Sequence, residues 1–542
     1  MSSKKGFVQI RMRLKWNRHS VAPAIVIAFV ALSPFLNKAF TIDDPLFLFQ
    51  AKHLLSDPFH PTAFEVVWSV VPERMSKIMP SGPMMAYLLL PCVALGGAEW
   101  IAHVMQLLFI TLAVVSTSSL ALCLGECSGR NASLLLVTTP AVLAMAGTAM
   151  PDVPAMAFGV FGVERLVAWR QERRLPQAVL GTLSLSMAIL CRSHLILLLG
   201  VALLAEVGDF LKRESWSSLR WTSCAPLLAC PLVVLAVLFV TRDPQASSMV
   251  LAEAARSLSF SEAVPTNLVA YFVHWALAIP LVIPWVLLHP RRVLMRPVLY
   301  LAAMAGFLYL RQHDLGRAFF LAPAIGLSAA VLWDVLQDAY VRRDSIQFLL
   351  GLWLLVPLSV VPYLHFPSKY LLVSAPAVAI LVARSLSVDS SRLRARLILG
   401  ATLALGLTLG ILILRADAVL SNMGRSAAKE LIAPNVDRGA TVWFGGHWGF
   451  QWYAEMSGAR PVTLTPPYPN RGDLLVSSGQ SGGIPVEALP VLRRIETFTD
   501  ERPGGRLMSR EDGAGFYSNG WGYMPWAWGQ QPADWYDLWE VD

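Results

Sequence analysis

Two adjacent carboxylates, Asp43 and Asp44, directly follow a long apolar run in the stretch Thr41-Ile-Asp-Asp-Pro. Like charges side by side repel each other, and removing them from water is costly. Helix capping accounts for one of the two, because Asp44 suits the N-cap position and Pro45 suits the first helical position. Capping leaves Asp43 without a structural role, so this carboxylate is the candidate for acid–base chemistry.

A third acid and several cations also lie between apolar segments. Asp152 opens an apolar segment in Met150-Pro-Asp-Val-Pro, where it too suits a helix cap. A single basic residue at such a place is commonly an anchor or a snorkelling side chain. Several of them together could instead bind the phosphate of a lipid. The basic and imidazole side chains concerned are Arg192, Arg311, His313, Arg317, His365 and Lys369.

The composition is that of a membrane protein. Of the 542 residues, 55% are hydrophobic and 15% are charged, which is more apolar than a soluble domain of this size requires. Apolar runs of about 17–25 residues, each long enough to span a bilayer, recur over 21–414. The net charge of +8 then reflects basic cytoplasmic loops rather than a nucleic-acid partner.

We therefore predict an all-α polytopic membrane protein with about thirteen transmembrane helices. A cleaved signal peptide is the alternative for the first run, but no small-residue cleavage site follows it. The expected spans are 21–40, 101–124, 131–149, 153–169, 176–191, 193–210, 222–240, 268–288, 297–311, 317–334, 346–364, 370–387 and 397–414.

Alternate connections between these spans are rich in arginine, and the positive-inside rule assigns them to the cytoplasm with the basic N-terminus. The opposite side then receives Asp43, Asp152, the cations named above and the C-terminal tail. We expect a multi-pass protein of the plasma (inner) membrane. The basic groups are Arg170/Arg173/Arg174, Lys212/Arg213/Arg220, Arg291/Arg292/Arg296, Arg342/Arg343 and Arg392/Arg394/Arg396.

Three parts of the chain are expected. Residues 1–20 form a basic cytoplasmic N-terminus, and 21–414 form the transmembrane domain. Its first extracytoplasmic loop, 41–100, holds two segments suited to the membrane surface. The first is 45–56, with Phe47, Leu48, Ala51, Leu54 and Leu55 on one face, Gln50 largely opposite and Phe49 out of place. The second is 83–97, which is too short to span and is either interfacial or re-entrant. Residues 415–542 form a small extracytoplasmic α/β domain, with strands at 441–444 and 474–476 and a helix near 447–457.

No ligand set in the sequence demands a metal or a cofactor. Of the six cysteines none lies in the tail, and Cys123 and Cys127 have no accompanying zinc ligands. A P-loop and a dinucleotide fingerprint are also absent. We expect that no cofactor is required, and a divalent metal remains an alternative. Gly406-x-x-x-Gly410 in the last span is expected to allow close helix packing.

The order of these motifs resembles the GT-C superfamily of membrane glycosyltransferases, over roughly residues 20–390. The nearest branch contains the protein O-mannosyltransferases and the lipid A aminoarabinose transferases (glycosyltransferase family 39-like). The motifs are the acidic pair Asp43-Asp44, the segment Met79-Pro-Ser-Gly-Pro-Met-Met-Ala-Tyr, Asp152 and the pair Lys369-Tyr370. The tail segment Gly446-His-Trp-Gly-Phe-Gln-Trp-Tyr-Ala-Glu is similar to external tails of bacterial members.

The sequence departs from this pattern at three places. The second acid is Asp44 where the family usually has Glu. The lysine before the proline pair is missing, and Arg74 or Lys77 is the candidate to replace it. The late basic residue is Lys369 rather than Arg. These differences concern the donor sugar and the phosphate contacts more than the reaction class.

The resemblance implies sugar transfer from a polyprenyl-phosphate-linked donor to an extracytoplasmic glycan, lipid or protein acceptor. Asp43 would be the general base, and the anomeric centre would be inverted. Asp152 would orient the acceptor or hold a basic neighbour. The remaining candidates would bind substrate and stabilise the leaving phosphate: Arg192, Lys369, Tyr370, His365, Arg311, Arg317 and Lys77.

Two other classes of protein are compatible with many apolar helices. A transporter usually has ionisable residues near the bilayer midplane and interrupted helices, whereas the charges of this chain gather at the ends of its apolar runs. A noncatalytic scaffold or sensor would act through the tail. The sequence favours the transferase over both.

The charge asymmetry gives a first prediction about topology. A reporter enzyme fused after Asp542 is expected to be active only in the extracytoplasmic compartment, because an odd number of spans separates the tail from the basic N-terminus. Cytoplasmic activity of this fusion would separate the tail from the side assigned to Asp43.

Overall fold

The computed structural model of the chain describes residues 18–79, 82–125, 128–213, 221–246, 262–389, 391–482 and 491–542. Predictions about the N-terminal residues 1–17, the pair Pro80–Ser81, Cys127, Arg220 and most of the expected loop 241–268 lie outside these ranges.

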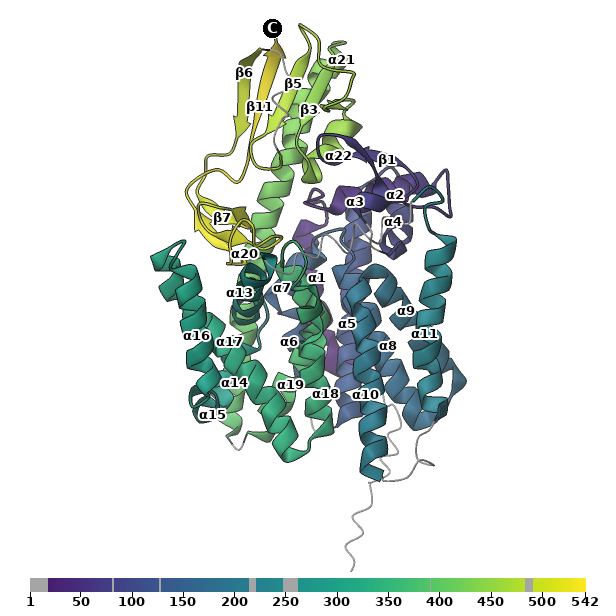
Figure 1. Cartoon of the computed structure of the whole chain (residues 1–542), viewed down its shortest axis with the longest axis vertical. Coiled ribbons are helices and arrows are strands. Elements are labelled where there is room, and N and C mark those ends of the chain that lie inside the picture. Colours follow the sequence, from purple (N-terminus) through teal and green to yellow (C-terminus); the bar gives the residue numbers. More distant parts are fainter. Residues whose placement is uncertain are drawn as a thin grey trace, which may run out of the picture.

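Helices packed side by side form the larger part of the molecule, and a smaller region with strands covers one end of them (Figure 1). The helices before the tail are α1 (Arg18–Leu32), α2 (Asp44–Leu54), α3 (Met75–Ile78), α4 (Met84–Ala94), α5 (Glu99–Leu124), α6 (Gly129–Val137), α7 (Pro140–Ala146), α8 (Asp152–Glu172), α9 (Leu175–Cys191), α10 (Ile196–Arg213), α11 (Trp221–Val240), α13 (Ala263–Leu277), α14 (Val282–Leu288), α15 (Pro290–Leu294), α16 (Pro297–Leu310), α17 (Leu315–Arg342), α18 (Ser345–Leu354), α19 (Ala375–Val388) and α20 (Arg392–Ala427). Short helical segments of other types are η1 (Ser33–Phe35), η2 (Ser193–Leu195), η4 (Val356–Val360), η5 (Ser368–Ser374) and η6 (Ala428–Ile432).

These apolar helices indicate a membrane protein, and most of them coincide with an expected span. In the part of the chain that is described, 4 helices are long and apolar enough to cross a bilayer, or up to 5 if a bent pair counts as one span. Other apolar helices have only 10–17 residues. Two expected spans are broken: 131–149 becomes α6 and α7, and 268–288 becomes α13 and α14, which are bent by 63°. The count of thirteen spans therefore stays a prediction.

The glycine pair of the last span lies where α20 packs against α7. A Cβ atom on Gly406 would come within 2.4 Å of the Thr138 carbonyl oxygen, and one on Gly410 within 2.7 Å of a Leu143 methyl carbon. Only glycine permits this approach of backbone to backbone, so the close packing expected from the sequence is confirmed.

The first loop differs from the expected surface helix. Helix α2 forms where the sequence predicts it, but it lies between α4 and a helix of the C-terminal region, α22 (Trp448–Met456). Phe49 packs against Trp452 of that helix at 5.4 Å between ring centroids, and Gln50 is buried, whereas Leu55 is exposed. Gln50 belongs to the predicted polar face but is buried, so the prediction is wrong at this residue.

The C-terminal region contains a five-stranded sheet of order β4-β3-β5-β11-β6. Strand β3 is parallel to β4 and β5, and α22 makes the crossover from β3 to β4, so the expected α/β arrangement is present. Strand β11 is antiparallel to β5 and β6 and lies between them. The strands of the chain are β1 (Glu65–Val67), β2 (Pro72–Arg74), β3 (Val442–Gly445), β4 (Arg460–Pro461), β5 (Leu474–Ser478), β6 (Leu492–Thr499), β7 (Gly504–Arg506), β8 (Met508–Ser509), β9 (Ala514–Gly515), β10 (Ala527–Gly529) and β11 (Trp535–Val541).

No break in the chain separates the helical part from this region. Helix α20 continues past residue 414, and η6 and α21 (Ala433–Asp437) follow it without an intervening loop. Figure 1 shows α20 rising from among the other helices to the strands. The domain boundary expected at 414/415 thus lies inside a helix.

The glycine contact predicts a stability difference between two variants of one helix. Gly406→Ala is expected to lower the free energy of unfolding by about 1–3 kcal/mol, because the Thr138 carbonyl cannot move away cheaply. Gly400→Ala is the matched control, since a Cβ there meets nothing within 4 Å and alanine favours the helix. Thermal unfolding of both variants in one detergent tests this, and equal stabilities would contradict it.

Candidate active site

An ion pair joins the first loop to the segment before α19. Asp43 is the N-cap residue of α2, and Lys369 is the second residue of η5. The Lys369 Nζ lies 2.7 Å from Asp43 Oδ2. The lysine side chain is 3% exposed and the aspartate side chain 30% exposed. The carboxylate is thus accessible from outside, while the ammonium is enclosed.

A second ion pair lies beside the first. Asp152 begins α8, and Arg192 follows the last residue of α9. The guanidinium donates from Nε to Oδ1 at 3.0 Å and from Nη2 to Oδ2 at 2.7 Å, a bidentate geometry. Its carbon lies 5.6 Å from the centre of the Tyr370 ring, which connects this pair to the neighbouring Lys369. Of the two roles expected for Asp152, the geometry shows the holding of a basic neighbour.

The charges around Asp43 keep it ionised. Burial raises its pKa, but the charge and hydrogen bond of Lys369, with smaller contributions from His365 and Arg192, bring the pKa below its ordinary value. Burial, aided by the charge of Lys369, lowers the pKa of His365 to about 4, so this imidazole is neutral at pH 7. A carboxylate paired in this way is a weak base, and removing Lys369 from it would raise its affinity for a proton.

Asp44 has a different environment from Asp43. It is fully buried, and its two oxygens accept hydrogen bonds from the backbone N–H groups of Thr41 and Ala149, both at 2.8 Å. Helix α2 begins at Asp44, so the expectation that Asp44 is the N-cap is wrong by one residue. Burial, opposed mainly by the charge of Lys38, raises the pKa of Asp44 to about 7. This acid ties the first loop to the segment before α8.

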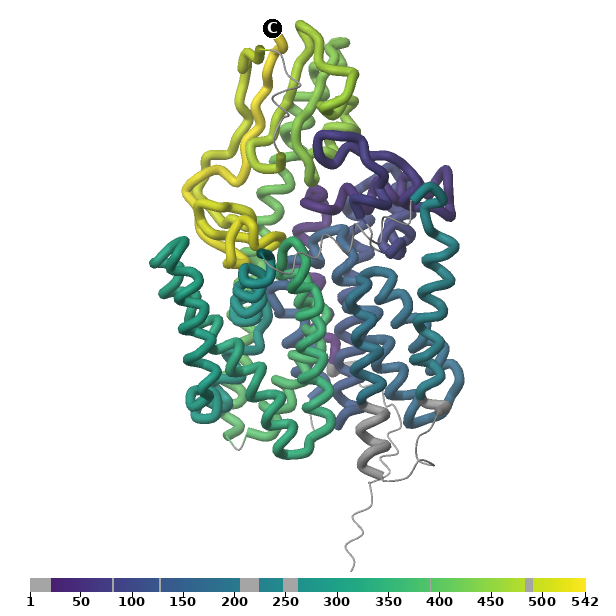
Figure 2. Tube along the Cα trace, in the orientation of Figure 1, coloured from purple at the N-terminus to yellow at the C-terminus, as the bar shows by residue number. Residues whose placement is uncertain are grey.

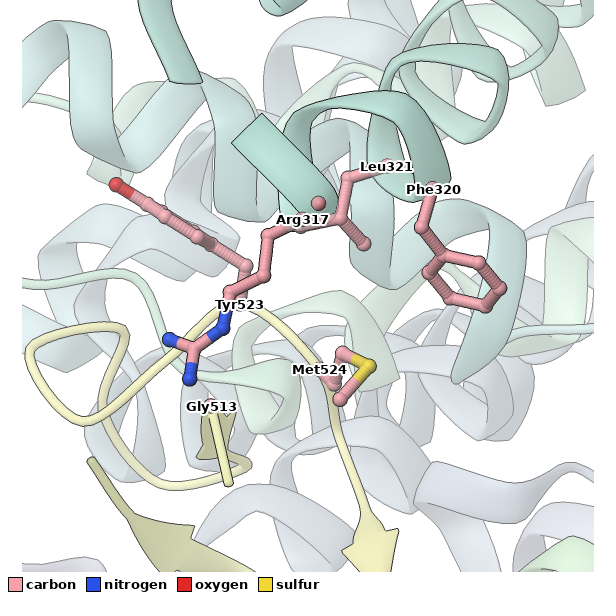
Figure 3. Close-up of a pocket in the computed structure, with 7 residues that line it drawn as sticks. Arg317, Phe320, Leu321, Gly513, Tyr523 and Met524 are labelled. Atoms are coloured by element: carbon pink, nitrogen blue, oxygen red, sulfur yellow. The ribbon is translucent and has the colours of Figure 1, made fainter. Parts of the chain in front are cut away.

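Three candidate cations lie away from these ion pairs. Lys77 pairs with Glu73 at 2.6 Å on the surface of the first loop. Arg317 pairs with Asp314 at 3.1 Å and donates to the Glu511 carbonyl at 2.6 Å. It lines a pocket of about 160 Å³ between the start of α17 and the C-terminal region, with its guanidinium pointing toward Gly513 (Figure 3). Arg311 is exposed after the last residue of α16.

A buried ion pair that the sequence reasoning missed lies behind Asp44. Lys38 and Asp417 are 2.8 Å apart, and both side chains are 0% exposed. The Thr41 hydroxyl donates to Asp417 at 3.1 Å. A charged residue at the end of an apolar run is a signal that the sequence does carry, at Lys38 and at Asp417. Their pairing cannot be read from the sequence, because Lys38 lies at the end of the first apolar run and Asp417 follows the last one.

The acids of the site do not form a metal-binding group. Asp43 and Asp152 each face a cation, and within the described ranges no three or more His, Cys, Asp or Glu side chains are grouped so that they could hold a metal ion. The expectation that the reaction requires no metal stays a prediction.

No protein-family model and no curated protein matches the sequence. Three similar solved structures are an oligosaccharyltransferase from Archaeoglobus fulgidus, ArnT from Cupriavidus metallidurans bound to undecaprenyl phosphate, and the arabinofuranosyltransferase AftD from Mycobacteria. Their TM-scores are 0.48, 0.41 and 0.41, and their identities are 12%, 15% and 16%. The similarity covers 83%, 86% and 98% of this chain and 65%, 94% and 42% of theirs.

This chain therefore spans less than two thirds of the oligosaccharyltransferase and less than half of AftD. The similar structures are GT-C glycosyltransferases, the superfamily that the motifs resemble.

The two backbone bonds to Asp44 predict that amide substitution is not conservative there. Asn offers one acceptor oxygen, so in Asp44→Asn one buried N–H loses its partner, at a cost of about 1–3 kcal/mol in unfolding free energy. Asp43→Asn keeps an acceptor for Lys369 but removes its counter-charge, so it is expected to lower the stability as well. Asp57→Asn, at the exposed Asp57–His60 pair, is the control. Thermal unfolding in one detergent ranks the three variants, and an Asp44→Asn protein as stable as the control would contradict this role.

The pKa of Asp44 also predicts how that stability difference depends on pH. The folded-state pKa, about 7, lies above the ordinary value of about 4. The stability linked to Asp44 is therefore complete below pH 4 and is lost as the pH rises through 7. The difference in unfolding free energy between wild type and Asp44→Asn should therefore be smaller at pH 8 than at pH 5. A gap that widens would show that the ionised form is the stabilising one.

Proposed function

We propose that this protein is a membrane glycosyltransferase that moves a sugar from a polyprenyl-phosphate-linked donor to an acceptor hydroxyl or amine, with Asp43 as the general base. The observation that carries the proposal is the Asp43–Lys369 ion pair beside the Arg192–Asp152 pair. It puts a partly exposed carboxylate next to two cations. Such a transfer needs a base for the acceptor and positive charge for the leaving phosphate.

Donor binding would exchange the partner of Lys369. The ammonium is held by Asp43 at 2.7 Å, and a donor phosphate reaching it would compete with that carboxylate. Once the phosphate shares Lys369, burial still disfavours the ionised carboxylate, so the pKa of Asp43 rises. The base would then become stronger only when the donor is in place.

Arg192 would be the second phosphate contact. Asp152 uses its Nε and Nη2 and so fixes the plane of the guanidinium. The same group also offers Nη1, which can donate to a phosphate oxygen. The pair is thus suited to bind the leaving group without releasing its own carboxylate partner.

The proposed reaction is a single displacement. The acceptor oxygen or nitrogen attacks the anomeric carbon while its proton passes to an Asp43 oxygen. The bond from the anomeric carbon to the phosphate oxygen breaks, and its electron pair leaves with the phosphate. Attack opposite the leaving group inverts the anomeric centre. An ionised phosphate needs no proton from a general acid.

We further propose that the site and residues 415–542 are extracytoplasmic and that residues 1–20 are cytoplasmic. The distribution of charge supports this orientation. The segments that carry Asp43 and Lys369 contact the C-terminal region, whereas α15 lies at the opposite end of the helices (Figure 1). There Arg292 and Arg296 each bind Asp334 at 2.6 Å. The acceptor would be a glycan, lipid or protein outside the cytoplasm.

A lipid or solute transporter is the second candidate, and the break between α13 and α14 favours it. Interrupted helices often surround transport sites. The Asp43–Lys369 and Asp152–Arg192 pairs favour the transferase. Both lie at one end of the helices, where they offer a partly exposed base and two cations for a leaving phosphate. Binding of a polyprenyl phosphate separates the two candidates.

The exchange of partners predicts opposite effects of two substitutions on the binding of undecaprenyl phosphate. Lys369→Gln removes a charge-assisted contact worth about 1.5–3 kcal/mol, so affinity should fall roughly 10- to 150-fold. Asp43→Asn removes the competitor for Lys369, so affinity should rise, while turnover falls about 10²–10⁴-fold. Native mass spectrometry of the purified variants measures the binding.

Asp57→Asn is the control for a lost carboxylate in the same loop, and it should change neither quantity. Unchanged affinity in both Lys369→Gln and Asp43→Asn would remove this ion pair from the phosphate site. Normal turnover of Asp43→Asn would exclude Asp43 as the base.

A further inference from the structure

The segment that directly precedes Asp43 is attached to the C-terminal region. This segment, residues 38–42, is here called the acid arm. The backbone N–H of Ala39 donates to the Asn422 side chain at 3.0 Å, and that of Phe40 donates to the Tyr453 hydroxyl at 2.9 Å. With the bond from the Thr41 hydroxyl to Asp417, three successive residues are held by α20 and α22.

The backbone of the acid arm is strained and needs this support. Ile42 has a φ of 36°, a left-handed value that a β-branched residue rarely adopts. Such a conformation persists only where the surroundings enforce it. Gly449, in the first turn of α22, lies so close that a Cβ there would come within 1.9 Å of the Phe40 carbonyl oxygen. The strained residue directly precedes Asp43.

The segment that directly precedes Lys369 is attached to the same C-terminal region. This segment, residues 361–368, is here called the lysine arm. The N–H of Phe366 donates to the Asn519 side-chain oxygen at 2.8 Å, and the N–H of Ser368 donates to the Phe516 carbonyl at 2.9 Å. The Asn519 amide donates in turn to the side-chain oxygen of Asn267 at 2.8 Å. The amide of Asn267 donates to the lysine arm at Val361 and Tyr363.

The loop that holds the lysine arm also contains the buried Tyr517, between Phe516 and Asn519. Burial, together with the charges of Asp417 and Asp44, raises the pKa of its phenol, so this loop lies near Asp417, which holds the acid arm. Figure 2 shows the last part of the chain descending from the strands onto the ends of the helices. The acid arm and the lysine arm lie far apart in the sequence. Side chains of α20 and α22 hold the first, and Phe516 and Asn519 hold the second.

We propose that the C-terminal region sets the distance between Asp43 and Lys369, with Asp417 and Asn519 as positioning residues. Asp417 acts on the acid arm through Thr41, and Asn519 acts on the lysine arm through the Phe366 N–H. The meaning of this role for catalysis rests on the proposed glycosyl transfer. The positioning itself is a property of the ion pair and can be measured without any substrate.

The Lys38–Asp417 pair supports this assignment. Two completely buried charges cost desolvation, and apolar residues would often stabilise such a site equally well. A hydrogen-bonded buried pair fixes one arrangement, however, because each partner is unstable without the other. Asp417 couples α20 to the acid arm at both Lys38 and Thr41.

Coupling by a water-soluble carbodiimide tests the proposal on the full-length protein. The reagent links a carboxylate to an amine that is already in contact, so the yield of the Asp43–Lys369 amide reports how often the pair is closed. The Glu73–Lys77 pair, at 2.6 Å in the same loop, supplies an internal reference. Mass spectrometry gives the ratio of the two yields for each variant.

Thr41→Val and Asn519→Ala are each expected to lower this ratio about 2- to 10-fold, the factor that corresponds to one lost hydrogen bond. Thr41→Ser keeps the hydroxyl and should restore the wild-type ratio. Thr402→Val is the matched control. Thr402 lies on α20, the helix that carries Asp417, and its hydroxyl donates to the Ile398 carbonyl one turn earlier in that helix. Asp43→Asn should abolish the Asp43–Lys369 product.

An unchanged ratio in both Thr41→Val and Asn519→Ala would overturn the proposal. So would an equal loss of both products, since that reports general unfolding rather than a displaced pair. Binding of undecaprenyl phosphate is measured on the same samples. A wild-type protein that does not bind it, while the ratio still responds, would refute the proposed function and leave the positioning role standing.

Discussion

An ammonium enclosed at the end of a group of apolar helices needs a counter-charge, and Asp43 provides it for Lys369. The contact is 2.7 Å long and joins two segments separated by 326 residues. Because an unpaired buried charge would be strongly destabilising, the first loop has to close over η5 for the helices to pack. The same closure leaves the carboxylate partly exposed, which is what a base for an external acceptor requires.

The other buried charges follow the same rule and divide the molecule into two ends. Arg192 and Asp152 lie beside Asp43, while Asp334 binds two arginines at the end where α15 lies. Both groups connect neighbouring helices. Only the group around Asp43 combines a partly exposed acid with two enclosed cations. Under the proposed function, this difference puts the reaction at one end and structural pairing at the other.

The C-terminal region belongs to the site as much as the helices do. Helix α20 enters it without a break, and α22 covers α2 and the acid arm. Strand β11 lies between β5 and β6, so the end of the chain completes the sheet that carries these contacts. Such a region cannot move away from the Asp43–Lys369 pair without breaking hydrogen bonds to both arms.

Local composition alone predicted most of the helices of this protein. Apolar runs predict the helices, short β-prone runs predict β3 and β5, and the Gly406–Gly410 spacing predicts a close helix contact. The distribution of arginine also groups Asp43, Asp152, Arg192 and Lys369 on one side. These signals are properties of neighbouring residues and of side-chain size, so they can be read without knowing how the chain closes.

Only the tertiary structure decided which charges meet. From the sequence Asp44 looks like a cap, whereas its oxygens bind the N–H groups of Thr41 and Ala149. Arg317 looks equivalent to Arg192, yet it binds the C-terminal region. Lys38 meets Asp417 only when α20 lies against the segment that follows η1. Pairing across hundreds of residues depends on the packing of whole helices, and no local pattern encodes the partner.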